Sequence, residues 1–485
     1  MPPTRIVSIA LFTAGLGIIV GAQAPQVSPT VAAFVSVQAP VVALEHVRVI
    51  DGTGGPASDD QTLVIQDGRI QSVGPAASTT VPSGARVLDL TGETVIPGLV
   101  GMHDHLFYPA PSGLGRIPGA PALYNEQGFS FPRLYLAAGV TTLRTTGSVA
   151  PYADLGIKKD IDEGRMPGPH LHTTGPYLEG KGAFTPQMHE LTGPDDATRM
   201  VNFWADAGAT SFKAYMHITR AELAAAVKAA HARGLKITGH LCSIGFREAA
   251  AIGIDNLEHG LEVDTEFDPG KQPDVCPPGN VSNDTLSTLD LNSQPVQDMI
   301  RNLVAHHVAV TSTLPVFEIS VPGRPPLEPR VLDALSPESR VDYLYARSRT
   351  AEHPGAQTII FKKEEQFERM FVQAGGTLLA GLDPTGYGGV LAGFGDQREL
   401  ELLVEAGFTP LEAIHIATEN GARFMGLDGR LGTIATGKAA DLVVIHGNPA
   451  ANIADIEHVV TVFKDGVGFD SQKLIDSVRG QVGLH

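Results

Sequence analysis

The chain has 485 residues, of which 43% are hydrophobic and 18% are charged, and this composition excludes an intrinsically disordered protein. Its length allows one large domain and a smaller accessory domain. Lys and Arg total 35 against 53 Asp and Glu, which gives a formal net charge of −18. A chain this acidic is not expected to bind nucleic acid or an anionic membrane surface.

The N-terminus has the pattern of a secretory signal peptide over residues 1–24. A single basic residue, Arg5, precedes an apolar run from Ile6 to Gly21, and small residues follow it. The run is shorter than the roughly 20 residues that a membrane-spanning helix needs, so a retained anchor is the weaker alternative. We therefore predict a periplasmic or secreted protein that has no membrane contact once the signal is removed.

Residues 25–43 are predicted to form a flexible lead-in, and strand-like segments follow them. Short runs closed by Gly, Pro or Asp occupy residues 44–97, and similar runs return in residues 425–485. We expect these two ends of the chain to build one small β-sandwich domain, with the last residues as its tail. The stretch between them is then an insertion into that domain.

Residues 98–424 alternate strand-like and helical segments, which is typical of a parallel α/β fold. The eight strand-like runs are VIPGLVGMHDH, VTTLRTTG, PHLHTTGPYL, ATSFKAYM, LKITGHLCS, IDNLEHGLE, VAVTSTLPV and GTLLAGLDPTG. Helical patterns separate several of them, and the clearest is TRAELAAAVKAAHARG, which has a Thr cap and a Gly stop. Eight such units predict a (β/α)8 TIM barrel with insertions.

The largest insertion, residues 263–296, follows the sixth strand-like run. It is acidic and contains Pro and Gly, so it is either a lid over the mouth of the barrel or a solvated loop. Cys276 lies within it, and Cys242 lies near the end of the fifth run. Export would permit a disulfide. The sequence leaves the pairing open and we do not predict it: Cys242 is expected to be buried and Cys276 to lie in a polar loop.

Ligand-type side chains recur where the predicted strands end, and in a (β/α)8 barrel those ends converge on one mouth. His103 and His105 flank an aspartate, so strand alternation sends both imidazoles to the same face. The complete set is His103, His105, Lys213, His240, His259 and Asp383. Four imidazoles and a carboxylate can hold divalent cations of the zinc type. Lys213 can act as a ligand only if its charge is removed, for instance as a carbamate.

The order of these residues, with the motifs around them, resembles the metal-dependent amidohydrolase superfamily. The motifs are VIPGLVGMHDHL at the His pair, NLEHG around His259 and GTIATGKAADLVVI near the C-terminus. The layout is similar to the imidazolonepropionase and Xaa-Pro dipeptidase branch, whereas TSFKAYM around Lys213 is similar to the lysine strand of the hydantoinase branch. The resemblance covers about residues 44–470 and implies a hydrolase of carbon–nitrogen bonds.

For the site, the resemblance implies two divalent metal ions, with zinc as the expected metal. One ion would be bound by His103, His105 and Asp383 and the other by His240 and His259, with the lysine carbamate as a bridge. A water molecule that bridges two cations has a much lower pKa than free water, so it becomes hydroxide near neutral pH. Asp383 is then the predicted catalytic residue, acting first as a base and then as an acid toward the leaving nitrogen.

Three further residues are predicted to contact substrate. Tyr177 ends the third strand, where hydantoinase-like relatives have a tyrosine that donates to the oxyanion. Tyr215 shares a strand face with the lysine two residues before it, and His217 could contact a substrate carboxylate. For Glu258 a structural ion pair is expected, since strand alternation points it away from the histidine that follows.

The combined prediction is an exported binuclear metal-dependent amidohydrolase that cleaves a C–N amide bond by a metal-bridged hydroxide. The expected substrate is small, either a dipeptide such as Xaa-Pro or an N-acyl amino acid. One alternative is a cyclic amide hydrolase of the hydantoin or imidazolone type, and another is a barrel that binds a metabolite or partner without catalysis. The complete ligand set favours an enzyme. Relatives of this kind are often homo-oligomers, and the sequence leaves the oligomeric state open.

Overall fold

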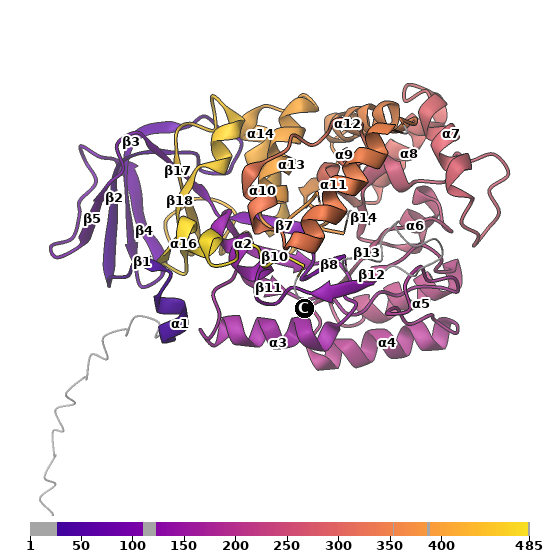
Figure 1. The fold of residues 1–485 in the computed structure, drawn as a ribbon, viewed down its shortest axis with the longest axis horizontal. Coiled ribbons are helices and arrows are strands. Elements are labelled where there is room, and N and C mark those ends of the chain that lie inside the picture. The colour runs from indigo at the N-terminus through magenta and orange to yellow at the C-terminus, as the bar shows by residue number, and fades with distance from the viewer. Residues whose placement is uncertain (1–26, 110–122, 353, 386–388, 484–485) are drawn as a thin grey trace, which may run out of the picture.

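The structure, a computed structural model, describes residues 27–109, 123–352, 354–385 and 389–483 (Figure 1). The molecule has a sheet-rich end and a helix-rich end. The predicted signal peptide lies outside the described residues and stays a prediction. Within the described ranges, no helix combines the length and the apolar character that crossing a bilayer requires.

Both ends of the chain contribute strands to one nine-stranded sheet. Its order is β1-β19-β18-β17-β6-β2-β3-β4, and β5 pairs with β2 beside this path. The strands are β1 (Val35–Val37), β2 (Val41–Val49), β3 (Ser58–Gln66), β4 (Arg69–Pro75), β5 (Arg86–Asp89), β6 (Glu93–Pro97), β17 (Leu442–His446), β18 (Val459–Lys464) and β19 (Val467–Asp470). Antiparallel pairing of β6 with β17, with Ile96 opposite Val443, joins the two ends. The division of this sheet into a sandwich stays a prediction.

The nine-stranded sheet has a hydrophobic core of its own. Val42, Leu44, Leu63, Val95 and Phe463 are among its fully buried side chains, and they come from both ends of the chain. β-branched and aromatic residues favour the pleated, half-buried surface that such a sheet offers. The two ends therefore depend on each other for burial of their apolar faces.

The predicted flexible lead-in, residues 25–43, carries secondary structure, which corrects the prediction from residue 29 onward. α1 (Pro29–Ala32) begins after Ser28, whose side chain accepts a hydrogen bond from the Val31 N–H. β1 then pairs antiparallel with β19, the last strand of the chain. The segment looks unstructured in the sequence because the partner of its strand lies more than 400 residues away.

Eight parallel strands occupy the middle of the chain. They are β7 (Leu99–Asp104), β10 (Val140–Thr145), β11 (His170–His172), β12 (Ser211–Ala214), β13 (Lys236–Gly239), β14 (Asn256–Glu258), β15 (Ala309–Ser312) and β16 (Leu378–Ala380). They form a three-stranded sheet, β11-β10-β7, and a five-stranded sheet from β12 to β16. A bridge joins Thr174 to Ser211 at one seam, and the Asp383 N–H donates to the His103 carbonyl at 3.0 Å at the other. The mixed α/β architecture agrees with the prediction.

Helices lie between these strands and after β16, and most of them occupy the helix-rich end (Figure 1). They are α2 (Phe131–Ala137), α3 (Pro151–Asp162), α4 (Pro194–Ala207), α5 (Arg220–His231), α6 (Phe246–Ile252), α7 (Gly279–Thr288), α8 (Gln294–Ala305), α9 (Leu314–Glu318), α10 (Pro329–Ala334), α11 (Pro337–Glu352), α12 (Gln357–Gln373), α13 (Phe394–Glu405), α14 (Pro410–His415), α15 (Gly421–Phe424) and α16 (Ser471–Asp476). Shorter elements are η1 (Gly260–Val263), η2 (Ile416–Asn420), η3 (Ile453–Glu457) and the antiparallel pair of β8 (Phe107–Pro109) and β9 (Tyr124–Glu126). The predicted Thr cap is confirmed, because Thr219 and Glu222 form a capping box at the start of α5.

Part of the insertion over residues 263–296 is packed structure. Its helix α7 contacts α12, and the Ser282 hydroxyl donates to Asp268, a buried residue, at 2.5 Å. The Thr265 hydroxyl donates to the Cys242 carbonyl at 2.6 Å and so holds the start of the insertion against the segment after β13. The lid and the solvated loop both stay predictions.

Cys242 and Cys276 form a disulfide with a Cα–Cα distance of 4.9 Å, a pairing that the sequence left undecided. The insertion turns back toward β13, and the Lys271 amine donates to the Ser243 carbonyl at 2.8 Å in the same region. This fold-back brings the polar loop to the buried cysteine. The insertion is therefore tied covalently to the chain segment that follows β13.

Replacing Cys276 with Ser is expected to lower the free energy of unfolding of the oxidised protein by about 2–4 kcal/mol, because a cross-link restricts the unfolded chain. Urea unfolding followed by circular dichroism measures this change. A reducing agent should destabilise the wild type by a similar amount and leave Cys276→Ser unaffected. Equal stability of the two oxidised proteins would contradict the cross-link.

Candidate metal centre

The six predicted ligand residues lie together at the ends of parallel strands. The first histidine and the lysine belong to β7 and β12, and the other four residues follow β7, β13, β14 and β16 by one to three positions. The carboxyl ends of parallel strands meet on one side of such a fold. The residues that the structure brings together are His103, His105, Lys213, His240, His259 and Asp383.

Asp383 lies at the centre of the group. Its Oδ2 is 3.5 Å from His103 Nε2 and 3.7 Å from His259 Nε2, and its Oδ1 is 3.6 Å from His105 Nε2. The Thr385 hydroxyl donates a hydrogen bond of 2.6 Å to Oδ1. His103, His105 and Asp383 each offer a ligand atom, and these three atoms lie within 4.8 Å of one another.

The remaining ligands surround this centre. The ring centroid of His240 lies 4.5 Å from that of His259, which lies 4.5 Å from that of His103. The Lys213 Nζ lies 3.0 Å from His103 Nε2, to which it can donate a hydrogen bond. The division of these residues into two groups of ligands, and the role of each residue, stay predictions.

Two of the ligands sit on left-handed backbone. Asp383 has a φ of 50° and His259 a φ of 71°. Such conformations cost residues other than glycine about 1–3 kcal/mol, and they persist where the surrounding structure imposes them. At His259 the left-handed backbone also ends the alternation of β14, so its side chain can turn toward the cluster although Glu258, its neighbour in sequence, contacts His103.

Burial determines the protonation states of the cluster. Desolvation, and after it the nearby charge of Lys213, lowers the pKa of all four imidazoles. The pKa of His240 falls to about 3. Burial also lowers the pKa of Lys213 to about 8. The pKa of Asp383 is raised, again by desolvation. At neutral pH the histidines are therefore uncharged, which is the form that binds metals.

The buried nitrogens that face Asp383 fit a bound cation. The Nδ1–H of His105 donates to the Gly147 carbonyl at 3.2 Å, so its Nε2 keeps a lone pair. Nε2 of His105 and Nε2 of His259 have no hydrogen-bond partner. Lone pairs at 3.6 and 3.7 Å from carboxylate oxygens leave buried polar atoms unsatisfied unless a cation or proton lies between them. Imidazole nitrogen and carboxylate oxygen are the ligands that zinc takes.

A buried ion pair orients the first histidine. Glu258 Oε2 accepts a hydrogen bond of 2.8 Å from the Nδ1–H of His103, and Arg144 pairs with Oε1 at 2.8 Å. The Thr238 hydroxyl also donates to this carboxylate. Because Nδ1 is committed to Glu258, the lone pair of His103 lies on Nε2, toward the cluster.

The predicted ion pair of Glu258 is confirmed by Arg144, but its predicted separation from the site is wrong. β14 ends at Glu258, and the left-handed backbone of His259 breaks the alternation on which that prediction depended. The adjacent Glu and His in NLEHG are the signal that could have indicated this role. Thr313 also orients a ligand, through a 2.7 Å hydrogen bond with His259 Nδ1, and no sequence signal marks it.

Two of the predicted substrate-binding residues border the cluster. The rings of Tyr177 and Tyr215 lie 4.7 Å apart, and the Lys213 Nζ lies 5.5 Å from each ring centroid. Tyr215 also lies 4.9 Å from the ring of His240. Tyr177 is buried and Tyr215 is half-buried. Their contact with substrate stays a prediction.

His217, the third predicted substrate contact, is oriented by a carboxylate. Glu179 is fully buried and accepts a hydrogen bond of 2.7 Å from the His217 N–H, and its other oxygen lies 3.4 Å from His217 Nδ1. Glu179 also accepts from the Gly180 N–H at 2.7 Å. Glu179 was not among the residues predicted from the sequence, although it lies in the loop after Tyr177.

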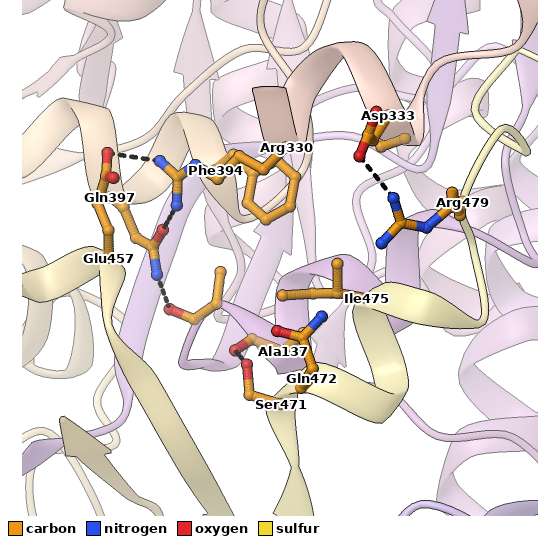
Figure 2. A pocket seen from close by; sticks show the side chains of 12 residues that line it. Ala137, Arg330, Asp333, Phe394, Gln397, Glu457, Ser471, Gln472, Ile475 and Arg479 are labelled. Atoms are coloured by element: carbon orange, nitrogen blue, oxygen red, sulfur yellow. Dashed lines mark hydrogen bonds and ion pairs between the residues drawn. The ribbon is translucent and has the colours of Figure 1, made fainter. Parts of the chain in front are cut away.

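A separate cavity of about 280 Å³ lies between α2, α10, α13 and α16. Figure 2 shows that Arg330 contacts Gln397 and Glu457, at 2.5 and 2.6 Å, while Arg479 contacts Asp333 at 2.5 Å. Both guanidinium groups are therefore already paired. The residues that line this cavity include none of the six predicted ligands, so the catalytic centre is not assigned to it.

The amidohydrolase family model matches residues 94–275 and 374–468, which is more than half of the chain. This chain belongs to the amidohydrolase family. All six predicted ligands fall inside the matched segments. The resemblance inferred from the motifs is thereby confirmed, and membership of the family indicates a hydrolase acting on carbon–nitrogen bonds.

Solved structures share the fold over most of the chain. One is a candidate prolidase from Bifidobacterium longum, at 26% identity with a TM-score of 0.64, covering 90% of this chain and 98% of that one. Another is a Xaa-Pro dipeptidase with bound methionine, at 19% identity with a TM-score of 0.65, covering 89% of this chain and all of that one. The second likeness shows the fold alone.

Relatives in sequence match a shorter part of the chain. A dihydroorotase from Trichlorobacter lovleyi is 32% identical over 107 residues, which is 22% of each chain. An imidazolonepropionase from Stenotrophomonas maltophilia is 32% identical over 113 residues, covering 22% of this chain and 25% of that one. The chain therefore spans about a quarter of the length of these relatives.

Replacing Glu258 with Gln is expected to weaken zinc binding about 10–100-fold, because the partner that orients His103 loses its charge. Thr313→Val should weaken binding in the same direction through His259. Competition with a chromophoric chelator measures the affinity. Glu368→Gln is the matched control: burial raises the pKa of the Glu368 carboxyl to about 8, so it is already protonated at neutral pH. Unchanged affinity in both test variants would contradict the assignment of the site.

Proposed function

We propose that this protein hydrolyses the amide carbon–nitrogen bond of a small substrate, either a dipeptide such as Xaa-Pro or an N-acyl amino acid. The observation that carries the proposal is the buried Asp383 carboxylate, which lies 3.5–3.7 Å from three neutral imidazole nitrogens. The candidate prolidase and the Xaa-Pro dipeptidase described with methionine share the fold over almost their full length, which supports a linear amide.

Two divalent ions, with zinc as the proposed metal, suit this donor set. His103, His105 and Asp383 would hold one ion, and His240 and His259 the other. When bound, the ions would polarise the substrate carbonyl and lower the pKa of a water molecule. The neutral imidazoles and the unpartnered nitrogens described above support this proposal.

Asp383 is the proposed carrier of the proton. Desolvation raises the pKa of its carboxyl above the usual value of an aspartate, which makes it a better proton acceptor. It would take a proton from the attacking water and deliver it to the leaving nitrogen. The Thr385 hydroxyl donates a hydrogen bond to Oδ1, so Oδ2 is the oxygen proposed to accept and release the proton.

Tyr177, Tyr215 and His217 are proposed to contact the substrate. Burial raises the pKa of Tyr177 well above its usual value, so its hydroxyl keeps its proton and can donate to a developing oxyanion. Tyr215 would border the substrate side chain. His217, oriented by Glu179, would face a substrate carboxylate of the kind that both proposed substrate classes carry.

The eight parallel strands are proposed to close into one (β/α)8 barrel, with the shared sheet of the chain ends as a β-sandwich. Contacts across the interior support closure: Arg144 of β10 pairs with Glu258 of β14, which accepts a hydrogen bond from His103 of β7. These three residues join the three-stranded sheet to the five-stranded sheet. Export through residues 1–24 to the periplasm or the medium is part of the proposal.

A cyclic amide hydrolase is the second candidate. The observation that favours it is the sequence likeness to a dihydroorotase and an imidazolonepropionase, at 32% identity in each case. The strand around Lys213 supports the same alternative. Both candidates use the same residues at the cluster, so the loops that shape the substrate cavity must distinguish them.

A substrate panel read by mass spectrometry tests the proposal. Zinc-loaded protein is expected to consume Xaa-Pro dipeptides or N-acyl amino acids and to leave hydantoin and dihydroorotate intact. Asp383→Asn should lower the turnover number at least about 100-fold, because it removes the proton carrier. Asp154→Asn, at another buried carboxyl, should not. Turnover of the rings alone would establish the second candidate, and turnover of neither class would contradict both.

Carbamate formation at Lys213 gives a further prediction. Only the neutral amine attacks carbon dioxide, forming the C–N bond and releasing one proton. With a pKa of about 8, the rate should rise with pH until about 8 and then level off, at a fixed concentration of dissolved carbon dioxide. Carbon-13 NMR of the protein equilibrated with labelled carbon dioxide detects the product.

Variants identify the lysine that carries the label. Lys213→Met should lose the carbamate signal, because no amine remains at that position. Lys464→Met, at another lysine whose pKa burial lowers, should keep it. Persistence of the signal in Lys213→Met would overturn the proposed carbamate.

A further inference from the structure

A second group of ligand-type side chains lies where the shared sheet meets the parallel strands. His170 begins β11, Asp441 directly precedes β17, and Asp465 lies in the turn between β18 and β19. Each offers a ligand atom, and these three atoms lie within 4.8 Å of one another. None of the three belongs to the cluster around Asp383.

The contacts within this group are close but are not hydrogen bonds. His170 Nε2 lies 3.2 Å from Asp465 Oδ2 and 3.6 Å from Asp441 Oδ2. Both His170 Nε2 and Asp441 Oδ2 are buried atoms without a hydrogen-bond partner. The Asp441 side chain is only 2% exposed, and burial raises the pKa of its carboxyl. An unsatisfied carboxylate oxygen in this environment is costly unless a cation compensates it.

The hydrogen bonds around the group leave one oxygen of each carboxylate facing His170. Asp441 Oδ1 accepts a 2.7 Å hydrogen bond from the Asp465 N–H, and Asp465 Oδ1 accepts one of 3.3 Å from Arg430. The Oδ2 atoms are the ones that approach His170. In each carboxylate, Oδ1 accepts a hydrogen bond that orients the side chain, and Oδ2 is left to bind a cation. Metal ligands are commonly oriented by supporting hydrogen bonds in this way.

The turn that carries Asp465 is preorganised. Asp465 and Gly466 have φ values of 49° and 78°, as the two central residues of a tight hairpin turn do. The turn therefore presents the carboxylate at a fixed position beside Asp441. Ligand atoms on a tetrahedral zinc ion lie about 3.3 Å apart, given zinc–ligand bonds of about 2.0–2.1 Å. The two distances from His170 Nε2 bracket this spacing.

A cavity beside the group has room for a water ligand and is lined by both acidic and basic side chains. His170 and Asp465 line a cavity of about 440 Å³, together with Asp162, Glu163 and Lys464. Asp162 and Glu163 pair with neighbouring basic side chains, and burial lowers the pKa of the Lys464 amine. Arg430 approaches Asp465 through Oδ1, so the Oδ2 atoms of both carboxylates stay available to a divalent ion.

We propose that His170, Asp441 and Asp465 bind a divalent cation of the zinc type, which joins the shared sheet to β11. The ligands come from both sheets, so the bound ion acts as a clamp between them. This site is structural and independent of the proposed hydrolysis. Without a metal, the same residues would make only an ion pair of protonated His170 with its two carboxylates.

Zinc content of the full chain tests the proposal. After equilibration with zinc and gel filtration, His170→Gln and Asp441→Asn are each expected to hold one equivalent less than the wild type. His172→Gln is the matched control on the same strand and should match the wild type. Hydrolysis of the best substrate should persist in His170→Gln, whereas His103→Ala should lose catalytic metal and keep the zinc at His170.

Crystals of the wild type grown with zinc give an independent measurement that needs no variant. An anomalous difference peak about 2 Å from His170 Nε2, between the two Oδ2 atoms, is expected. Zinc content that is equal in His170→Gln and wild type would overturn the proposal, as would crystals with zinc at the Asp383 cluster and no peak at His170. A fall in thermal stability with unchanged zinc content would identify the ion pair instead.

Discussion

The burial of polar atoms around Asp383 is the constraint on which the site depends. Three imidazole nitrogens and a carboxylate approach one another where water is largely excluded. Charged imidazoles would repel Lys213, and desolvation disfavours them further, so the histidines are neutral. Neutral lone pairs that face a carboxylate need a shared cation or proton. The chemistry proposed for the site follows from this requirement.

A network inside the parallel strands holds the ligands in that arrangement. The guanidinium of Arg144 donates to the Met102 carbonyl at 2.5 Å, to Asn256 at 2.8 Å and to Glu258 at 2.8 Å. Arg144 comes from the three-stranded sheet, and the two side chains come from the five-stranded one. A buried ion pair of this kind contributes little net stability, because its desolvation opposes its attraction. Its value here is orientation, since it fixes the tautomer of His103.

The shared sheet, built from both ends of the chain, contacts the parallel strands away from the Asp383 cluster. Asp441 directly precedes β17, and Asp465 lies in the turn between β18 and β19 of the shared sheet. Both approach His170 at the start of β11. The cluster around Asp383 lies at the carboxyl ends of the parallel strands, whereas His170 lies at the amino end of one. The two sets of ligand-type residues therefore lie at different ends of the group of parallel strands, as the separate catalytic and structural roles proposed for them require.

Local pattern was enough to find the six residues that cluster around Asp383. The His-x-His spacing follows strand periodicity, and each of the other ligands lies at or just beyond the end of an apolar run, so the cluster and the alternating α/β order could be predicted from the sequence. The same periodicity failed at Glu258, because the backbone turns left-handed at the next residue and strand alternation stops there. No local signal reports a dihedral angle of that kind.

Long-range contacts decided the rest. The disulfide between Cys242 and Cys276 requires the insertion to fold back, β1 requires a partner from the far end of the chain, and the His170 group requires two sheets to meet. The sequence by itself determined which residue types lie at strand ends, because strand periodicity acts over a few residues. Only the tertiary structure decided which distant segments meet, because that depends on burial summed over the whole chain.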